Sequence, residues 1–238
     1  MPLLLGTNRD EPKLFVAGRD RTMDDATLLS SVRQTLFGGS SKPGTGDAQQ
    51  EARRQLAESR RLIGVFKGTR AGSHTPDTEE NVDIFDAISA ETWHANCRRL
   101  AAAHASASDG TAGTFVYLFT HESPARRGLL GSAHALEMPF VFGSFNDSGR
   151  AAGEAAMPEV IADAATSRFA GAGAEVDRLG REMRAAWLSF ARSGVPAEGW
   201  GRYDAEARPT MVFGTAQSGV EQDPLGSERA AMESAVGR

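Results

Sequence analysis

Apolar residues recur at helical spacing through the first hundred residues of the chain. Between residues 28 and 37 they follow a three-four spacing that predicts an amphipathic helix, which the pair Gly38-Gly39 would end. Residues 47–63 are mostly charged and predict a second helix with few core positions. The same spacing continues in two further groups that predict two more helices: Val82, Phe85 and Ile88, then Trp93, Cys97 and Leu100.

Short apolar runs that predict strands interrupt this helical pattern. Pro2–Leu5 reads as a short buried strand, Thr114–Thr120 alternates in polarity, and Arg208–Phe213 is the last strand predicted. Between the second and third strands, one apolar stripe with an opposite charged face predicts a long packed helix: Val176, Leu179, Met183, Trp187 and Phe190. The tail after Pro224 is polar and is predicted to form no more than a frayed helix.

Candidate chemistry lies beside two of these segments. The first strand runs directly into Gly6-Thr7-Asn8-Arg9-Asp10-Glu11, and the end of a strand is where α/β enzymes keep functional groups. His134 lies between a Gly-Ser-Ala turn and the stiff apolar run Pro139–Phe142. This setting suits a general base, which needs solvent on one side and fixed packing on the other. Taken alone, the segment favours the alternative of a buried structural histidine.

Together the two segments resemble the type B carboxylesterases, the α/β-hydrolase family that includes bacterial para-nitrobenzyl esterases and cholinesterases. In that family the strand before Gly-x-Asn-x-Asp-Glu leads to the triad acid, and the run His-x-x-Glu-x-x-Phe-Val-Phe-Gly carries the triad base. Further blocks recur in the family's order over most of the chain: Asp83–Phe85, Thr114–Phe119, Ser123-Pro124, Trp187–Pro196 and Arg208–Phe213. The resemblance is weakest from Gly38 to Thr78.

The resemblance implies roles for three residues. Glu11 occupies the position of the triad acid and His134 that of the triad base. Glu137 matches an acid that the family buries near the site, so it is expected to support the pair without touching the substrate. Asp10 is the competing acid and is expected to point to a neighbouring turn. Residues from about 20 to 110 match the helical region that walls the family's active-site gorge.

One motif of the family does not occur in the sequence. A serine hydrolase of this fold carries its nucleophile on Gly-x-Ser-x-Gly, upstream of the acid and the base. No such motif is present, and each candidate serine lacks a flanking glycine: Ser40, Ser73, Ser132, Ser144 and Ser193. The oxyanion hole is expected to be missing as well, because its amides come from the same upstream region.

The expected fold is therefore the C-terminal part of an α/β-hydrolase, residues 1–238, with few strands, many helices and the N-terminal half missing. Without that half, Leu3–Leu5 and the Phe115–Phe119 strand are both expected to lose sheet neighbours. Two functions stay open. One is an ester hydrolase segment that is inactive until an N-terminal half supplies the serine. The other is a non-catalytic binding protein that keeps the hydrolase shape.

The composition of the chain limits the kinds of partner and cofactor that are expected. A net charge of −5 and a pI near 5.6 argue against nucleic acid, and no apolar run approaches the roughly 20 residues of a membrane span. The single Cys97 excludes an internal disulfide and suits the cytoplasm. The five histidines are scattered, without metal-ligand spacing, and no Gly-rich phosphate loop precedes a helix, so neither metal nor cofactor is expected. The expected partner is a small ester substrate, bound once the N-terminal half is present.

Overall fold

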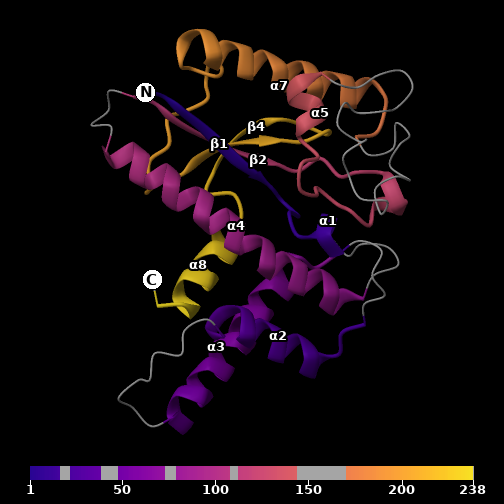
Figure 1. Ribbon diagram of the computed structural model, residues 1–238, viewed down its shortest axis with the longest axis vertical. Helices are drawn as coiled ribbons and strands as arrows, with labels where there is room; N and C mark the ends of the chain where they lie inside the picture. Colours follow the sequence, from indigo (N-terminus) through magenta and orange to yellow (C-terminus); the bar gives the residue numbers. More distant parts are fainter. Residues whose placement is uncertain (17–21, 39–47, 73–78, 108–111, 144–169, 238) are drawn as a thin grey trace. The chain divides into compact units, whose positions relative to one another are not determined.

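A computed structural model describes residues 1–16, 22–38, 48–72, 79–107, 112–143 and 170–237 (Figure 1). The chain forms two compact units. The first comprises residues 1–18 and 93–224, and the second comprises residues 19–92 and 225–238. The candidate site lies in the first unit. The Gly/Ser/Pro-rich segments at residues 40–46 and 70–76 are predicted from the sequence to be loops, and the first of them and residues 73–76 of the second fall outside the described residues.

The first unit is built on a four-stranded sheet in the order β1-β2-β3-β4. Its strands are β1 (Leu3–Asn8), β2 (Thr114–Phe119), β3 (Pro209–Phe213) and β4 (Gly219–Gln222). β1 and β3 both pair with β2 in parallel, whereas β4 runs antiparallel to β3. The predicted strands are all present. β4 was not predicted, because four residues with three exposed positions give too weak an alternation.

Helices cover both faces of this sheet. The aromatic side chains of Phe115 and Phe119 pack against α7 (Ala174–Ser193) and α5 (Met138–Phe142) on one face. On the other face Val116 packs against Ala101 of α4 (Glu80–Ala107). Two short helices, α1 (Lys13–Val16) and η1 (Ala125–Gly128), also belong to this unit. The predicted stripe on α7 is packing, as interpreted, since all five of its residues join this core.

The sheet ends at β1 on one side. Leu3 and Arg9 donate their backbone N–H groups toward β2, to Gly113 and Phe119. Because successive residues of a strand direct their backbone groups to alternate sides, Leu4, Gly6 and Asn8 face away from β2. In the described part of the chain no strand pairs with this side of β1. The expected open edge is therefore present at β1, but the same expectation for Phe115–Phe119 was wrong, since β2 has a neighbour on each side.

The second unit is helical. It contains α2 (Asp25–Phe37), α3 (Ala48–Thr69), the part of α4 before Trp93, and α8 (Gly226–Ala235). Its core joins apolar residues of all four helices: Leu28, Val32, Leu62, Phe66, Ile84, Ile88 and Met232. The two helices predicted over residues 82–100 are one continuous helix, α4. The polar tail also packs more firmly than predicted, because α8 buries Ala231 and Met232.

Candidate active site: the Glu11–His134 pair

Two consecutive carboxylates, Asp10 and Glu11, follow β1 and bind different partners. Asp10 accepts hydrogen bonds from the backbone N–H of Ser132 at 2.9 Å and from the guanidinium of Arg9. Burial alone would raise the pKa of Asp10, but the charges of Arg9 and Lys13 and these hydrogen bonds hold it below its usual value. Asp10 therefore anchors the turn to the loop that carries His134. This matches the expectation that Asp10 serves a neighbouring turn.

Glu11 is buried and meets His134 directly. Its Oε2 lies 2.6 Å from Nδ1 of the imidazole, and its Oε1 accepts the backbone N–H of Asn8 at 2.8 Å. The two residues are separated by 123 positions in the chain, and the parallel pairing of β1 and β2 brings them together. A carboxylate on Nδ1 fixes the proton on that nitrogen and leaves Nε2 as the basic atom.

The loop of His134 combines rigid flanks with an open face. Ser132, Ala133 and Leu136 on either side are fully buried, while the His134 side chain is 42 % exposed. Two residues of the loop adopt left-handed conformations, Gly131 with φ 54° and Ala135 with φ 64°. A Cβ at Gly131 would lie 2.6 Å from Oδ2 of Asp10, so only glycine fits there. The loop is thus fixed on both sides of an exposed imidazole.

Aromatic rings flank the imidazole. The ring centroids of Phe15 and Trp93 lie 5.3 Å and 5.4 Å from that of His134, and the two residues are 54 % and 40 % exposed. Phe15 lies in α1, directly after the turn that carries Glu11, and Trp93 lies in α4. Sequence reasoning missed Phe15 altogether and used Trp93 only as one of the apolar positions that predict a helix. The apolar spacing around Trp93 does not distinguish a buried ring from one that faces a site.

Glu137 lies beside the pair and is bound to Asn8. Its Oε2 accepts a hydrogen bond of 2.6 Å from the side-chain amide of Asn8. Burial raises the pKa of Glu137 above its usual value, and the hydrogen bond from Asn8 opposes this rise. Asn8 itself was quoted as part of the motif without a role. A polar residue at the last position of an apolar strand was the available signal.

Other residues considered from the sequence have structural surroundings. The hydroxyl of Ser132 is buried and donates to the carbonyl of Phe119 at 2.8 Å. His121 is buried with Nε2 2.8 Å from the carbonyl oxygen of Ala170, and burial lowers its pKa. Burial raises the pKa of the Cys97 thiol to about 11, so this cysteine is a poor nucleophile at neutral pH.

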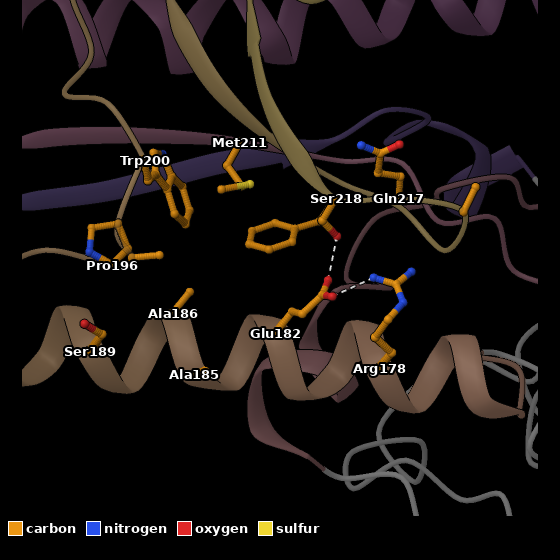
Figure 2. Close-up of a pocket in the computed structure, with 13 residues that line it drawn as sticks. Arg178, Glu182, Ala185, Ala186, Ser189, Pro196, Trp200, Met211, Gln217 and Ser218 are labelled. Atoms are coloured by element: carbon orange, nitrogen blue, oxygen red, sulfur yellow. Dashed lines mark hydrogen bonds and ion pairs between the residues drawn. The ribbon is translucent and has the colours of Figure 1, made fainter.

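A cavity of about 700 Å³ lies elsewhere in the same unit (Figure 2). Helix α7, β3 and the β3–β4 turn line it, with Trp200, Met211 and Phe213 forming an apolar side. At one end Glu182 accepts hydrogen bonds from Arg178 and Ser218, as the dashed lines in Figure 2 show. Its described lining includes neither the β1 turn nor the His134 loop, so the cavity is separate from the Glu11–His134 pair.

The described residues include no group of three or more His, Cys, Asp or Glu side chains placed to hold a metal ion. None of their helices combines the length and the apolar character that crossing a membrane requires. The cytoplasmic location expected from Cys97 stays a prediction.

Comparisons with known proteins agree with the resemblance. No protein-family model matches the chain. The para-nitrobenzyl esterase of Bacillus subtilis (strain 168) is 30 % identical over 232 residues, which are 96 % of this chain and 37 % of the relative. A solved PNB esterase is 22 % identical with a TM-score of 0.60, covering 98 % of this chain and 38 % of that one. A Geobacillus stearothermophilus carboxylesterase is 27 % identical with a TM-score of 0.57, covering 97 % and 40 %.

The chain thus spans well under half the length of the relatives it matches. Its neighbours in sequence and in structure are para-nitrobenzyl esterases and carboxylesterases, so the predicted resemblance to the type B carboxylesterases is confirmed. The α/β-hydrolase fold is confirmed over that partial length. A partial match is consistent with the C-terminal portion predicted from the order of the motifs.

Proposed function

We propose that this chain is the acid-base part of a carboxylic ester hydrolase, in which Glu11 and His134 activate a serine supplied by an N-terminal segment of the complete enzyme. The observation that supports it most is the 2.6 Å contact between Glu11 Oε2 and His134 Nδ1, combined with the exposure of the imidazole. A binding protein that only keeps the hydrolase shape has no need of this contact. We therefore favour the hydrolase over the binding protein.

The proposed chemistry is proton transfer at Nε2 of His134. Glu11 holds the Nδ1 proton, so the lone pair of Nε2 is left to take the proton of the serine hydroxyl as that oxygen attacks the ester carbonyl. The imidazolium that forms is stabilised by the buried carboxylate of Glu11. His134 then returns the proton to the departing alkoxide, and the same cycle with water releases the acid.

In this proposal the nucleophile lies outside residues 1–238. The sequence contains no Gly-x-Ser-x-Gly, and the hydroxyl of the nearby Ser132 is already bound to Phe119. The open side of β1 suggests where the N-terminal segment would join, because the outward backbone groups of Leu4 and Gly6 can pair with a further strand. The other proposed partner is a small ester substrate. Neither nucleic acid nor a membrane has a part in the proposal.

The test is reconstitution. The purified chain is mixed with an N-terminal segment of the Bacillus subtilis para-nitrobenzyl esterase that carries Gly-x-Ser-x-Gly, and hydrolysis of p-nitrophenyl acetate is followed. The chain alone is expected to act no faster than imidazole at equal concentration, because a base and an acid without a positioned nucleophile lose most of the triad's benefit.

The mixture is expected to show ester hydrolysis that a serine-directed phosphonate abolishes, with the label on the added segment. Turnover by the chain alone, with phosphonate bound to one of its own serines, would contradict the proposal. So would a stable complex that shows no hydrolysis.

A further inference from the structure

We propose that Asn8 is a positioning residue that holds both members of the Glu11–His134 pair, the base through its side chain and the acid through its backbone. Asn8 is the last residue of β1 and is 1 % exposed. Among the described residues its hydrogen bonds go to Ala133, Glu137, Glu11 and His94, and none reaches the imidazole of His134. Its assignment as a positioning residue for catalysis rests on the function proposed above, whereas the contacts themselves do not.

The side-chain amide of Asn8 forms hydrogen bonds to the loop on both sides of His134. Its Nδ2 donates to the carbonyl of Ala133 at 2.6 Å and to Oε2 of Glu137 at 2.6 Å. Ala133 directly precedes His134, and Glu137 follows it by three residues. One nitrogen therefore fixes the two flanks of the segment that carries the imidazole.

These two hydrogen bonds matter because the loop between them is strained. Ala135 has φ 64°, a left-handed conformation that is unfavourable for a residue with a Cβ. Such a residue relaxes unless its neighbours hold it in place. The contacts at Ala133 and Glu137 enclose Ala135, so they maintain the turn that points the imidazole toward Glu11.

The backbone of Asn8 fixes the acid. Its N–H donates to Oε1 of Glu11 at 2.8 Å, which leaves Oε2 for His134. Its carbonyl oxygen lies 3.1 Å from Nε2 of His94 in α4. Both backbone groups of Asn8 face away from β2, so at this one position of the β1 edge they are occupied by the site instead of by a strand.

The geometry also explains why the residue is an asparagine. The Ala133 carbonyl can only accept, and so can a carboxylate at Glu137, so the group between them must supply two N–H bonds from one atom. A primary amide does so without charge. An aspartate of the same shape would set a carboxylate against both acceptors. The Oδ1 atom of Asn8 is buried without a hydrogen-bond partner among the described residues, a cost that an apolar side chain would avoid.

The experiment uses the intact 238-residue chain labelled with 15N-histidine. The His134 Nδ1 proton is assigned by its loss in His134→Ala, and its chemical shift and exchange rate with water are measured in wild type and in Asn8→Leu. Leucine keeps the backbone contacts and the approximate volume but removes both donors. We expect the downfield Nδ1 signal to move upfield and its exchange to accelerate by roughly tenfold or more, the equilibrium effect of losing a hydrogen bond to a charged acceptor.

Asn81→Leu is the matched control. The Asn81 amide also donates to one carbonyl, that of Met23, and to one carboxylate, that of Asp25, but in the second unit. It is expected to leave the His134 signal unchanged. Asn8→Ser provides a milder variant should Asn8→Leu not fold, because its hydroxyl retains one donor and should give an intermediate exchange rate. Unchanged His104 and His121 signals report that the variant has folded.

The reconstituted complex supplies the kinetic readout. Asn8→Leu is expected to lower kcat by roughly tenfold or more with KM unchanged, because substrate binding does not involve Asn8. If no complex is active, the proposed function fails, but the exchange measurement still tests the positioning role. A His134 Nδ1 signal in folded Asn8→Leu with wild-type shift and exchange would overturn the inference, whatever the activity.

Discussion

The two ends of the parallel pair β1–β2 each hold a histidine, and the two imidazoles are bound differently. At the amino end, His104 engages both ring nitrogens: Nδ1 lies 2.7 Å from the Thr114 hydroxyl and Nε2 3.1 Å from the carbonyl oxygen of Met1. At the carboxyl end, His134 engages Nδ1 with Glu11, and no hydrogen bond from the described residues reaches its Nε2. An imidazole with both nitrogens occupied ties chain segments together, whereas one with a free basic nitrogen can transfer a proton.

The difference follows from the direction of the strands. At the carboxyl ends of parallel strands the chain leaves the sheet in loops, and those loops collect functional side chains. Here the turn after β1 and the segment after β2 meet, so Glu11 and His134 share that end. At the amino end, the helix α4 carries His104 back to the start of β2, and the histidine serves that junction.

The largest effect that would test this comparison is on catalysis. In the reconstituted complex, His134→Ala is expected to lower kcat by roughly 10⁶, because the serine loses its base. His104→Ala is expected to change kcat by less than about tenfold, because the hydrogen bonds of His104 contribute to the stability of the fold and not to proton transfer. Rates for p-nitrophenyl acetate under saturating conditions decide the matter. An active complex that tolerates His134→Ala would remove the distinction between the two ends.

The next effect separates the two neighbouring carboxylates. Glu11→Gln keeps the packing but favours the wrong tautomer of His134, and should lower kcat by roughly 10⁴. Asp10→Asn should cost about tenfold or less, because its amide oxygen can still accept the Ser132 N–H. The two kcat values are compared in the same complex. A larger loss for Asp10→Asn would exchange the roles assigned to these acids.

Sequence alone predicts the elements of this fold better than their ends and their pairing. The stripe on α7 and the alternation in Thr114–Thr120 follow from burial on one face, so periodicity reveals them. The short strand β4 and the helix α8 lack that signal. Their positions depend on pairing with β3 and on packing against α3, which are contacts between distant segments.

The candidate site likewise contains residues that the sequence predicts and residues that it does not. A family motif is enough to propose Glu11 and His134, because both lie at recognisable positions after strands. The contacts of Asn8 and the exposed faces of Phe15 and Trp93 are not evident, since they arise where three separate segments meet. Local patterns report which face of an element is buried, but not which segment lies against it.

A smaller effect concerns the open edge of β1, where the N-terminal segment is proposed to bind. Leu4→Pro removes an outward N–H of β1 and leaves the ladder with β2 intact, so it should weaken binding of the N-terminal segment by roughly tenfold. Val220→Pro makes the same change on the opposite edge, at a residue whose N–H faces away from β3 because Asp223 bonds to Arg208 across the ladder. It should leave the binding unchanged. Calorimetric titration of both variants measures the difference, and equal losses would show that association does not use the β1 edge.

The smallest effect is the pH dependence of stability at Glu137. Burial raises the pKa of Glu137, so the folded chain binds this proton more tightly than the unfolded chain does. The stabilising contribution is therefore complete at pH values below the ordinary range of a glutamate and is lost as pH rises through the raised pKa. Glu137→Gln keeps an acceptor for Asn8 and removes the titration, so its free energy of unfolding relative to wild type should improve across that interval. Urea unfolding of both proteins from pH 4 to pH 8 measures this, with Glu233→Gln, which changes a more exposed glutamate of α8, as the control. A constant difference between Glu137→Gln and wild type over the whole range would mean that Glu137 is no better shielded than an ordinary surface carboxylate.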